Sequence, residues 1–469
     1  MKMTAENRAQ LMLNEPLHKV IPGLAVPTII SMLVTAIYNM ADTYFVSQIS
    51  TEASGAVGVV FSAMSIIQAL AFMIGMGSGT NLSIALGAGR DEDAKTFVSM
   101  AFFTAFVSGL VLMAVCNLNL ERLVRFLGAT DEITPHAMAY ASYIFFAAPF
   151  MMSSFVMNNL LRFQGMAGYA MVGITTGGIL NIILDPILIF ALNLGTAGAA
   201  IATAISQLIS FLILLFMCNT KKEIIPIRLR NFRPTRQKYG RILYNGLPSL
   251  GRQGIASVAT IILNRVAGGI STDPATVNAA IAAMSIVSRF VMFINSAVIG
   301  FGQGFQPVCS FCYGAGKYRR VREAYFYCGK VATVILLVLG SIAMLLSEPI
   351  IRLFRAEDLQ VVSIGTTALR LQLLTLPLWG FYVMSNMATQ SMGYGLSSTI
   401  ISSARQGIFL IPTVLILPHF FGILGLQLAQ PVADVLAFIL AVILMRGIMK
   451  KLSQMPDKPH PLDPKDHEV

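Results

Sequence analysis

Residues 75–90, GMGSGTNLSIALGAGR, are matched by residues 302–317, GQGFQPVCSFCYGAGK, in the second half of the same chain. Both stretches begin with Gly-x-Gly and end with Gly-Ala-Gly followed by a basic residue. The second begins 227 residues after the first (302 − 75). The same spacing relates Gly195 to Gly422. The chain is therefore an internal duplication, and each stretch marks the same place in one of two tandem halves.

The composition excludes an ordinary soluble protein. The chain has 469 residues, of which 55% are hydrophobic and only 12% charged, with a mean hydropathy of +0.72. A soluble globular domain has about 25% charged residues. The sequence therefore predicts a protein that crosses a lipid bilayer many times.

Apolar runs long enough to span a bilayer, about 20 residues each, recur along both halves. We expect an all-α integral membrane protein with twelve transmembrane helices in two six-helix bundles. The runs lie near 18–47, 54–86, 95–116, 134–160, 168–190, 196–218, 243–268, 277–312, 323–346, 361–390, 396–418 and 422–447. Because six is even, both bundles enter the membrane in the same orientation, related by a pseudo-twofold axis along the membrane normal. The expected divisions are 1–17 (N-terminal segment), 18–218 (N-lobe), 219–242 (basic linker), 243–450 (C-lobe) and 451–469 (tail).

The positive charges indicate the orientation. The formal net charge is +11, and the Lys and Arg residues gather in alternate loops. The loops on the side of both termini carry most of them, including the linker and Arg162. By the positive-inside rule, both termini are expected in the cytoplasm. We expect the basic linker to contact lipid headgroups and not nucleic acid.

A duplicated membrane protein of this kind usually works by alternating access, so the repeat favours transport over catalysis. The glycine stretches do not bind nucleotide, because no strand precedes them and no GK[ST] follows. We interpret them as helix ends and close packing positions. Cys309-x-x-Cys312 lies in an apolar run without a second pair or a nearby His, so we interpret both residues as packing and expect no cofactor.

Three acidic residues, Asp42, Asp185 and Asp434, fall well inside the expected spans. A charged side chain at the bilayer centre costs roughly 2.5–3.5 kcal/mol on insertion scales. Such a residue needs a partner, a proton or a function. Structural pairing is the alternative interpretation for all three, and it weighs most for Asp434.

Asp185 is expected to lie in an oxygen-rich pocket. Asn181 precedes it by one helical turn, and Thr203 lies on the next, antiparallel helix. Together these side chains suit a proton or Na⁺, which prefer hard oxygen ligands. If Asp42 also turns inward, repulsion between the two carboxylates favours a shared proton.

The second half lacks this pocket. At the repeat spacing Asp185 falls on Pro412 and Gly178 falls on Arg405. Arg405 and Asp434 lie on neighbouring antiparallel runs, so we expect a C-lobe ion pair that is either structural or locks one conformation. Arg289 lies in the middle of its expected run, and three roles stay open for it. Its side chain contacts substrate, extends toward the membrane surface, or has an internal partner.

With twelve spans, tandem halves, the doubled glycine stretch, a first-run Asp and a fifth-run Asn-x-x-x-Asp-Pro, the chain resembles the multidrug and toxic compound extrusion (MATE) family over roughly residues 15–450. Within it, the chain is similar to the DinF-like branch and the MepA-type multidrug exporters. The resemblance implies a cation site at Asp42, Asn181, Asp185 and Thr203, and a bend of the first helix at Pro27. The NorM-like branch relies on acids in helices 7 and 10, which have none here. The coupling ion, H⁺ or Na⁺, stays open.

The resemblance also implies a monomeric antiporter in the cytoplasmic membrane of a prokaryote, which exports amphipathic, often cationic, drugs or toxins. Met and aromatic side chains adapt to varied flat cations, although such residues also commonly face lipid. The expected substrate surface consists of Tyr38, Asn39, Met40, Met64, Gln68, Met73, Phe150 or Phe155, Met157 and Asn159.

Three alternatives remain at this point. A flippase for lipid-linked precursors, from the related superfamily, would commonly need a strongly cationic cavity, but only Arg289 and Arg405 lie near mid-depth. A membrane prenyltransferase would need clustered acids such as DDxxD, which the sequence lacks. A channel is compatible with the composition, but an ion pocket in only one half suits exchange better.

Overall fold

The computed structural model describes residues 5–268, 274–354 and 358–460, and these residues are helical apart from short connections. The helices are α1 (Ala5–Asn14), α2 (Leu17–Ser47), α3 (Thr51–Gly87), α4 (Asp91–Leu118), α5 (Leu120–Phe126), α6 (Thr134–Phe163), α7 (Ala167–Pro186), η1 (Ile187–Ala191), α8 (Gly195–Thr220), η2 (Leu229–Asn231), α9 (Arg236–Gly268), α10 (Pro274–Gly314), α11 (Tyr318–Leu345), α12 (Ser347–Phe354), α13 (Leu359–Ser391), α14 (Gly395–Ser403), η3 (Ala404–Phe409) and α15 (Leu410–Gln454).

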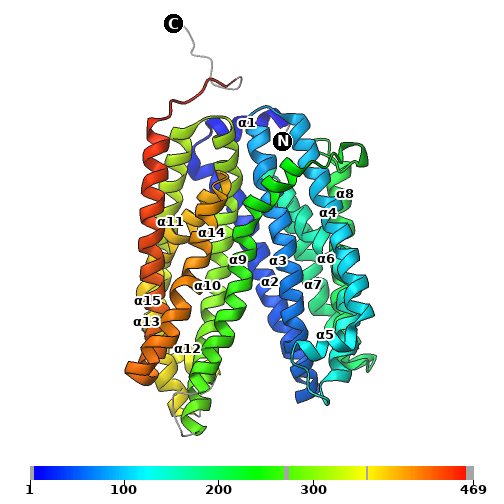
Figure 1. The fold of residues 1–469 in the computed structure, drawn as a ribbon, viewed down its shortest axis with the longest axis vertical. Helices are drawn as coiled ribbons and strands as arrows, with labels where there is room; N and C mark the ends of the chain where they lie inside the picture. The colour runs from blue at the N-terminus through cyan, green and yellow to red at the C-terminus, as the bar shows by residue number, and fades with distance from the viewer. Residues whose placement is uncertain (1–4, 269–273, 355–357, 461–469) are drawn as a thin grey trace.

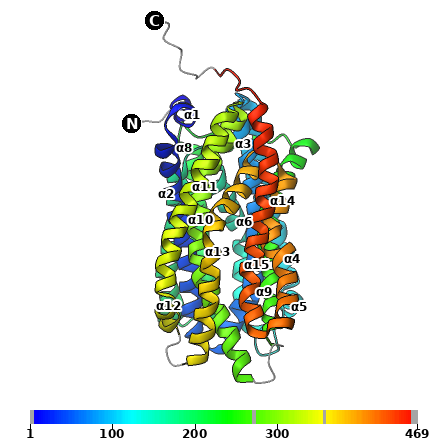
Figure 2. The same cartoon turned by 90° about the vertical axis from the view of Figure 1, so that its left-hand side faces the viewer.

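The long helices stand side by side in two groups (Figure 1). We call α2 to α8 the N-terminal group and α9 to α15 the C-terminal group. Both ends of the described chain lie at one end of the molecule, at the top of the view. Figure 2 shows from the side that the helices keep this common direction. The two main apolar cores lie around Phe145 in α6 and Phe305 in α10, and each includes residues of the other group, such as Ile242 of α9 in the first and Leu24 of α2 in the second.

In the described residues, ten helical segments are long and apolar enough to cross a membrane, compared with the twelve expected runs. The expected run at 243–268 lies in α9, where Arg252, Arg265 and several hydroxyl and amide side chains lower the hydropathy. The last two expected runs fall within one of these segments, Gly395–Gln454, but they are two helices. This segment is interrupted at Gly422, where φ is 55°. An all-helical, multi-span membrane protein is confirmed.

The glycine stretches end two helices, as the sequence predicts. α3 ends at Gly87 and α10 ends at Gly314. Gly89 and Gly316 have φ of 68° and 75°, a left-handed conformation that glycine adopts at low cost.

The same stretches also let the two groups touch. A Cβ on Gly87 would collide with the carbonyl oxygen of Phe311, and a Cβ on Gly314 would collide with that of Ile84. The two contacts are related by the repeat, since 311 − 84 and 314 − 87 are both 227. α3 and α10 therefore cross with their backbones in contact.

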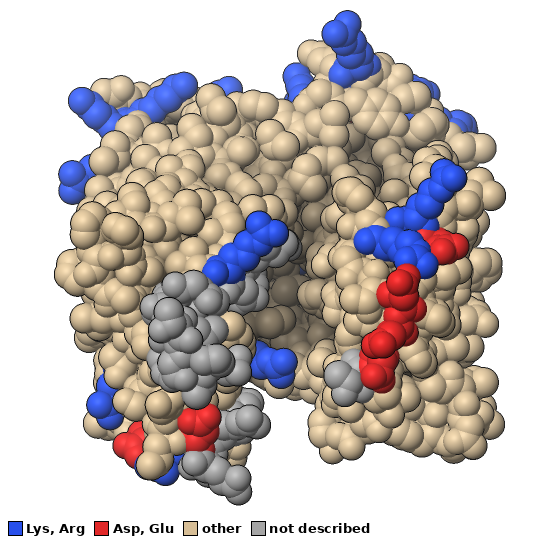
Figure 3. Space-filling model, turned by 60° about the horizontal axis from the view of Figure 1, so that its bottom comes forward, with Lys and Arg blue, Asp and Glu red and all other residues tan. Residues whose placement is uncertain are grey.

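Two further glycines each bring another pair of helices together across the groups. A Cβ on Gly77 of α3 would collide with the carbonyl oxygen of Ile242 in α9. Gly304 of α10 has the same relation to the backbone of Ala25 in α2. These contacts lie toward the end of the molecule that carries the chain termini. At the opposite end the groups separate, and Figure 3 shows a deep cleft opening between them.

Candidate functional site

The structure brings Asn181, Asp185 and Thr203 together inside the N-terminal group. Asn181 and Asp185 lie one turn apart on α7, and Thr203 faces them from α8. The Asn181 amide donates to Asp185 Oδ1 and to Thr203 Oγ1, at 3.3 Å each. All three residues are buried, and Asp185 has no exposed surface. Gly195, with φ of 55°, makes the tight turn that aligns the two helices.

Asp42 approaches the same place from α2. The Tyr140 hydroxyl, on α6, donates to Asp42 Oδ2 at 3.2 Å. Asp42 lies close enough to Asp185 for their charges to interact. Tyr140 is fully buried, and the sequence reasoning above did not identify it. The only sequence signal is a tyrosine hydroxyl within an apolar run, which needs a partner when buried.

Three oxygen atoms of this cluster have no hydrogen-bond partner within the described residues. They are Asp42 Oδ1, Asn181 Oδ1 and Asp185 Oδ2. Leaving one buried polar atom unpaired costs about 1–3 kcal/mol, so three in one cluster indicate a site for a species that the oxygens can bind. Two carboxylates and an amide carbonyl fit a proton or Na⁺. No group of three or more His, Cys, Asp or Glu residues that suits a heavier metal occurs in the described part of the chain.

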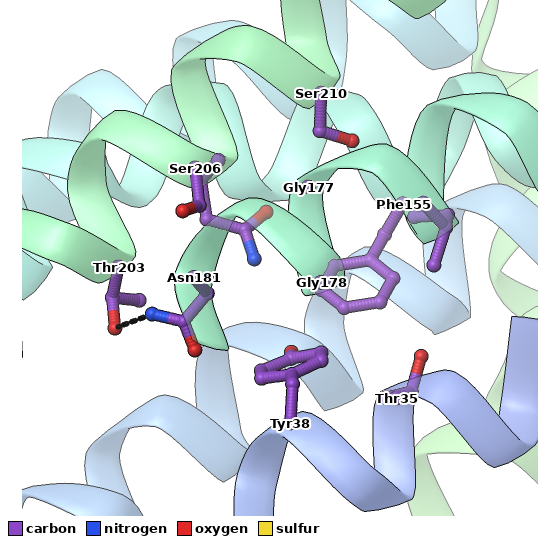
Figure 4. A pocket seen from close by; sticks show the side chains of 11 residues that line it. Thr35, Tyr38, Phe155, Gly177, Gly178, Asn181, Thr203, Ser206 and Ser210 are labelled. Atoms are coloured by element: carbon purple, nitrogen blue, oxygen red, sulfur yellow. Dashed lines mark hydrogen bonds between the residues drawn. The ribbon is translucent and has the colours of Figure 1, made fainter. Parts of the chain in front are cut away.

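A narrow pocket adjoins Asn181 and Thr203 (Figure 4). Tyr38 of α2 and Phe155 of α6 cover one side, while Gly177 and Gly178 of α7 border the pocket without side chains. Its cavity volume is about 10 Å³, close to the space that one water-sized sphere needs. In this conformation the pocket admits an ion or a water, not a drug-sized molecule. Its lining residues are Thr35, Tyr38, Phe155, Ile174, Gly177, Gly178, Asn181, Thr203, Ser206, Gln207 and Ser210.

The expected substrate residues divide between this pocket and other places. Tyr38 and Phe155 line the pocket. Asn39, Gln68 and Met73 are half-buried, Met64 is buried, and Met40 is exposed. Met157 is fully buried in a cluster on α4, α6 and α8. Phe150 packs against that cluster through the ring of Phe211, 5.4 Å away between centroids.

Two other expected sites have clear surroundings. Pro27 lies inside the continuous helix α2. It borders a lateral groove that α2 forms with α1 and α7. Arg405 and Asp434 form the expected ion pair in the C-terminal group, with 2.7 Å between Nε and Oδ1. Arg289 is exposed on α10 and has no hydrogen-bond or ion-pair partner among the described residues.

Arg162 does not lie in a loop, in contrast to the sequence expectation. It lies in the last turn of α6 and is 1% exposed. Its guanidinium donates across the groups to the backbone oxygen of Gln303 at 2.8 Å and to Gln306 Oε1 at 3.0 Å. It also donates to Asn159 Oδ1, which explains the burial of Asn159. An arginine near the end of a helix usually extends its guanidinium into water, whereas the Arg162 guanidinium contacts α10 of the other group.

The network continues into the C-terminal group. Gln306 donates to Gln390 at 3.3 Å. Gln390 in turn donates to the Asn245 carbonyl at 2.9 Å and to Ser249 at 3.0 Å. Buried polar side chains therefore connect α6, α10, α13 and α9 near the end where the groups are closed.

Known proteins resemble the chain over almost its whole length. A family model described as MatE matches residues 27–187 and 248–416. The multidrug export protein MepA of Staphylococcus saprophyticus is 26% identical over 434 residues, which cover 92% of this chain and 93% of that protein. MepA of Staphylococcus aureus (strain NCTC 8325) is also 26% identical, covering 93% and 95%.

Solved structures share the fold. One, described as the outward-facing conformation of a multidrug resistance MATE family transporter of the MOP superfamily, matches with a TM-score of 0.88 and 28% identity. The match covers 95% of this chain and 99% of that one. A MATE in complex with MaL6 matches with a TM-score of 0.89 and 28% identity, at the same coverage.

Proposed function

The chain belongs to the MatE family of membrane transporters and is not an enzyme, and from that premise we propose that it is a cation-coupled multidrug antiporter. In this proposal a proton or Na⁺ enters the cell through the protein and drives amphipathic, often cationic, compounds out. The similar proteins named as multidrug exporters support this substrate class.

The unpaired oxygens of Asp42, Asn181 and Asp185 carry the proposal. They are buried, they come from two helices, and they need a positively charged partner. A cation arriving from the cleft side satisfies them and favours the arrangement of α2 and α7 that binds it best. Pro27 removes a backbone hydrogen bond in α2 and gives this helix a place to bend. Thr203 holds Asn181 in the orientation that leaves its carbonyl free.

The substrate is proposed to bind in the cleft or in an enlarged form of the pocket beside Tyr38 and Phe155. The present pocket is too small for a drug. Cation binding and drug binding therefore exclude each other if a drug must separate α2 from α7. Competition of this kind is the simplest coupling between the two ligands.

The two helix groups are proposed as the N-lobe (18–218) and the C-lobe (243–450), with six spans each, joined by the linker 219–242. Both termini, 1–17 and 451–469, then lie in the cytoplasm of a prokaryotic cell. On this orientation the cleft in Figure 3 opens to the outside. We propose that a monomer suffices, since the two groups of one chain together complete the main apolar cores.

The energy of one entering cation suffices for useful export. One elementary charge crossing 100 mV provides about 2.3 kcal/mol, which supports roughly a fifty-fold gradient of a neutral drug. A monocationic drug exchanged for one cation cancels this electrical contribution, so a concentration gradient of the ion must then drive export.

Carboxylate-to-amide variants test the proposal in cells. Asp42→Asn and Asp185→Asn should each abolish efflux of a fluorescent cationic dye while the protein still reaches the membrane in normal amounts. The matched control is Asp131→Asn, an acid in the loop before α6 that is 89% exposed and pairs with Arg125. Undiminished efflux by both pocket variants would contradict the proposal.

A further inference from the structure

The C-terminal group holds a polar cluster in the region that the repeat relates to the pocket of the N-terminal group. Gly195 and Gly422 both have φ of 55° and are 227 residues apart. They begin equivalent stretches of α8 and α15. At this spacing Thr203 corresponds to Gln430, and Gln207 corresponds to Asp434.

Arg405 occupies the place of a glycine. The 227-residue spacing relates it to Gly178. Gly165 and Gly393, which share φ of 79°, are 228 residues apart, and this spacing relates Arg405 to Gly177. Both glycines line the pocket of the N-terminal group, so either alignment puts a long cationic side chain at a position that carries no side chain in that group.

The C-terminal cluster contains the same kinds of oxygen ligand as the N-terminal one. Asp434 supplies a carboxylate, Gln430 an amide and Thr375 a hydroxyl. Their counterparts by chemistry in the N-terminal group are Asp185, Asn181 and Thr203.

The two clusters differ in how their oxygens are satisfied. Asp434 Oδ1 accepts from Arg405 Nε at 2.7 Å and from Gln430 Nε2 at 2.8 Å. Asp434 Oδ2 accepts from Thr375 at 3.3 Å. The Arg405 guanidinium also lies over the ring of Trp379, 4.3 Å from its centroid. Both carboxylate oxygens of Asp434 therefore have partners, whereas Asp42, Asn181 and Asp185 each retain an oxygen without one among the described residues.

We propose that Arg405 is a tethered cation that permanently fills the C-terminal counterpart of the cation pocket, so that exchangeable cations bind only in the N-terminal group. The inference rests on the proposed function of the N-terminal pocket. The protein then has one exchangeable cation site per chain, and Arg405 determines that number. Removing the guanidinium converts the cluster into a second site for a proton or Na⁺.

Trp379 reports on this site directly, because it is the only tryptophan of the chain and contacts Arg405. The experiment measures its emission while Na⁺ is added at fixed pH, and separately while pH is varied between 5 and 9. All variants carry Asp185→Asn, so that the N-terminal pocket does not contribute. The charged and titratable groups around Asp434 are Arg405 and Tyr382, with Arg252 beyond Tyr382. Arg and Tyr normally keep their protonation state in this range.

The expected result is a saturable change of emission in Arg405→Met and none with Arg405 present. Arg405→Lys, which retains a tethered charge, should also show none. Adding Asp434→Asn to Arg405→Met should remove the change. A response with Arg405 present, or no response to either ion in folded Arg405→Met, would overturn the inference.

A second measurement needs no change at Arg405. Calorimetric titration with Na⁺, or proton release on drug binding, should give one exchangeable cation in the wild type and none in Asp185→Asn. Residual cation binding that Asp434→Asn removes would show an open C-terminal site and overturn the inference. If Asp185→Asn leaves efflux intact, the proposed function fails, but the Trp379 titration still decides whether Arg405 fills a latent site.

Discussion

At the scale of single residues, Tyr140 is the neighbour that holds Asp42 in the pocket. Its hydroxyl is the one hydrogen-bond donor to the Asp42 carboxylate within the described residues. The donor orients one oxygen, and the other has no hydrogen-bond partner among the described residues. On the proposed function, a residue in this position acts on cation binding through Asp42 and not by direct contact with the drug.

Tyr140→Phe should therefore change the cation concentration at half-maximal efflux by about two- to tenfold, since one hydrogen bond contributes about 0.5–1.5 kcal/mol. The maximal rate at saturating cation should change less. The measurement is dye efflux as a function of cation concentration.

The matched control is Tyr143→Phe, which removes a hydroxyl from the same helix at a residue that is 42% exposed. It should leave the cation dependence as in the wild type. An identical cation dependence in Tyr140→Phe would mean that the hydroxyl does not act on the site.

The sequence predicted most of this site because isolated acids in apolar runs are conspicuous. Asp42 and Asp185 stand out by the cost of burying a charge, Asn181 follows from helical spacing, and Thr203 follows from the short turn to the next, antiparallel helix. Tyr140 is missed because tyrosine is common in membrane helices. The sequence assigned Arg162 to a loop because it lies just beyond an apolar run, where exposed cations are common. Only the packing of α6 against α10 reveals that it is buried.

At the scale of helices, the glycines that bring α3 and α9 together have the clearest structural requirement. Gly77 touches the backbone of Ile242, and a backbone carbonyl cannot move aside as a flexible side chain can. Any Cβ at this position separates the two helices.

Gly77→Ala should therefore destabilise the closed contact by about 1–3 kcal/mol, the usual cost of overpacking. The control is Gly58→Ala on the same helix, where an added Cβ would meet nothing within 4 Å. There the loss of backbone freedom in the unfolded chain should stabilise α3 by about 0.5–1 kcal/mol. Thermal unfolding of the purified proteins in detergent measures both, and equal melting temperatures would contradict the close contact.

The positions of the long helices follow from apolar runs and agree with the sequence expectation within a few residues at most ends. The short helices α1, α5 and α12 could not be anticipated, since they are too short to leave an apolar run. The final two expected runs, by contrast, are two helices that meet at Gly422, where the backbone leaves the helical conformation.

At the scale of the whole molecule, the network around Arg162 connects the two groups on the side opposite to the cleft. Arg162 has no acidic partner among its hydrogen-bond acceptors in the described residues. Its acceptors are carbonyl, amide and thioether groups, which can release it at lower cost than a carboxylate. Such a contact suits a closure that must open in each cycle.

Arg162→Met should shift the population away from the conformation with the open cleft. Nitroxides at Leu118→Cys and Leu345→Cys, both exposed at the open end, should lie closer together on average than in the otherwise native protein. Cys116, which is half-buried, is replaced by Ser. Double electron–electron resonance measures the distances.

Arg319→Met is the matched control, because Arg319 lies on the exterior of α11 and pairs with Glu323 on the same helix. It should leave the distance distribution unchanged. An unaltered distribution in Arg162→Met would mean that the network does not stabilise the closed side.

The duplication was readable from the sequence, and it accounts for the reciprocal contacts of Gly87 and Gly314. The conformation could not be predicted from the sequence, because a transporter that alternates between two states, as we propose, must encode both with one sequence. Only the structure reveals which side is closed here.

The central claim is that a cation bound by Asp42, Asn181 and Asp185 drives export. Its most direct test is efflux of a cationic dye from proteoliposomes under an imposed pH gradient or an imposed Na⁺ gradient, for wild type and Asp185→Asn. The account predicts efflux under at least one gradient in the wild type and its loss in the variant. Equal gradient-driven efflux by both proteins, or no efflux by the wild type under either gradient, would contradict it.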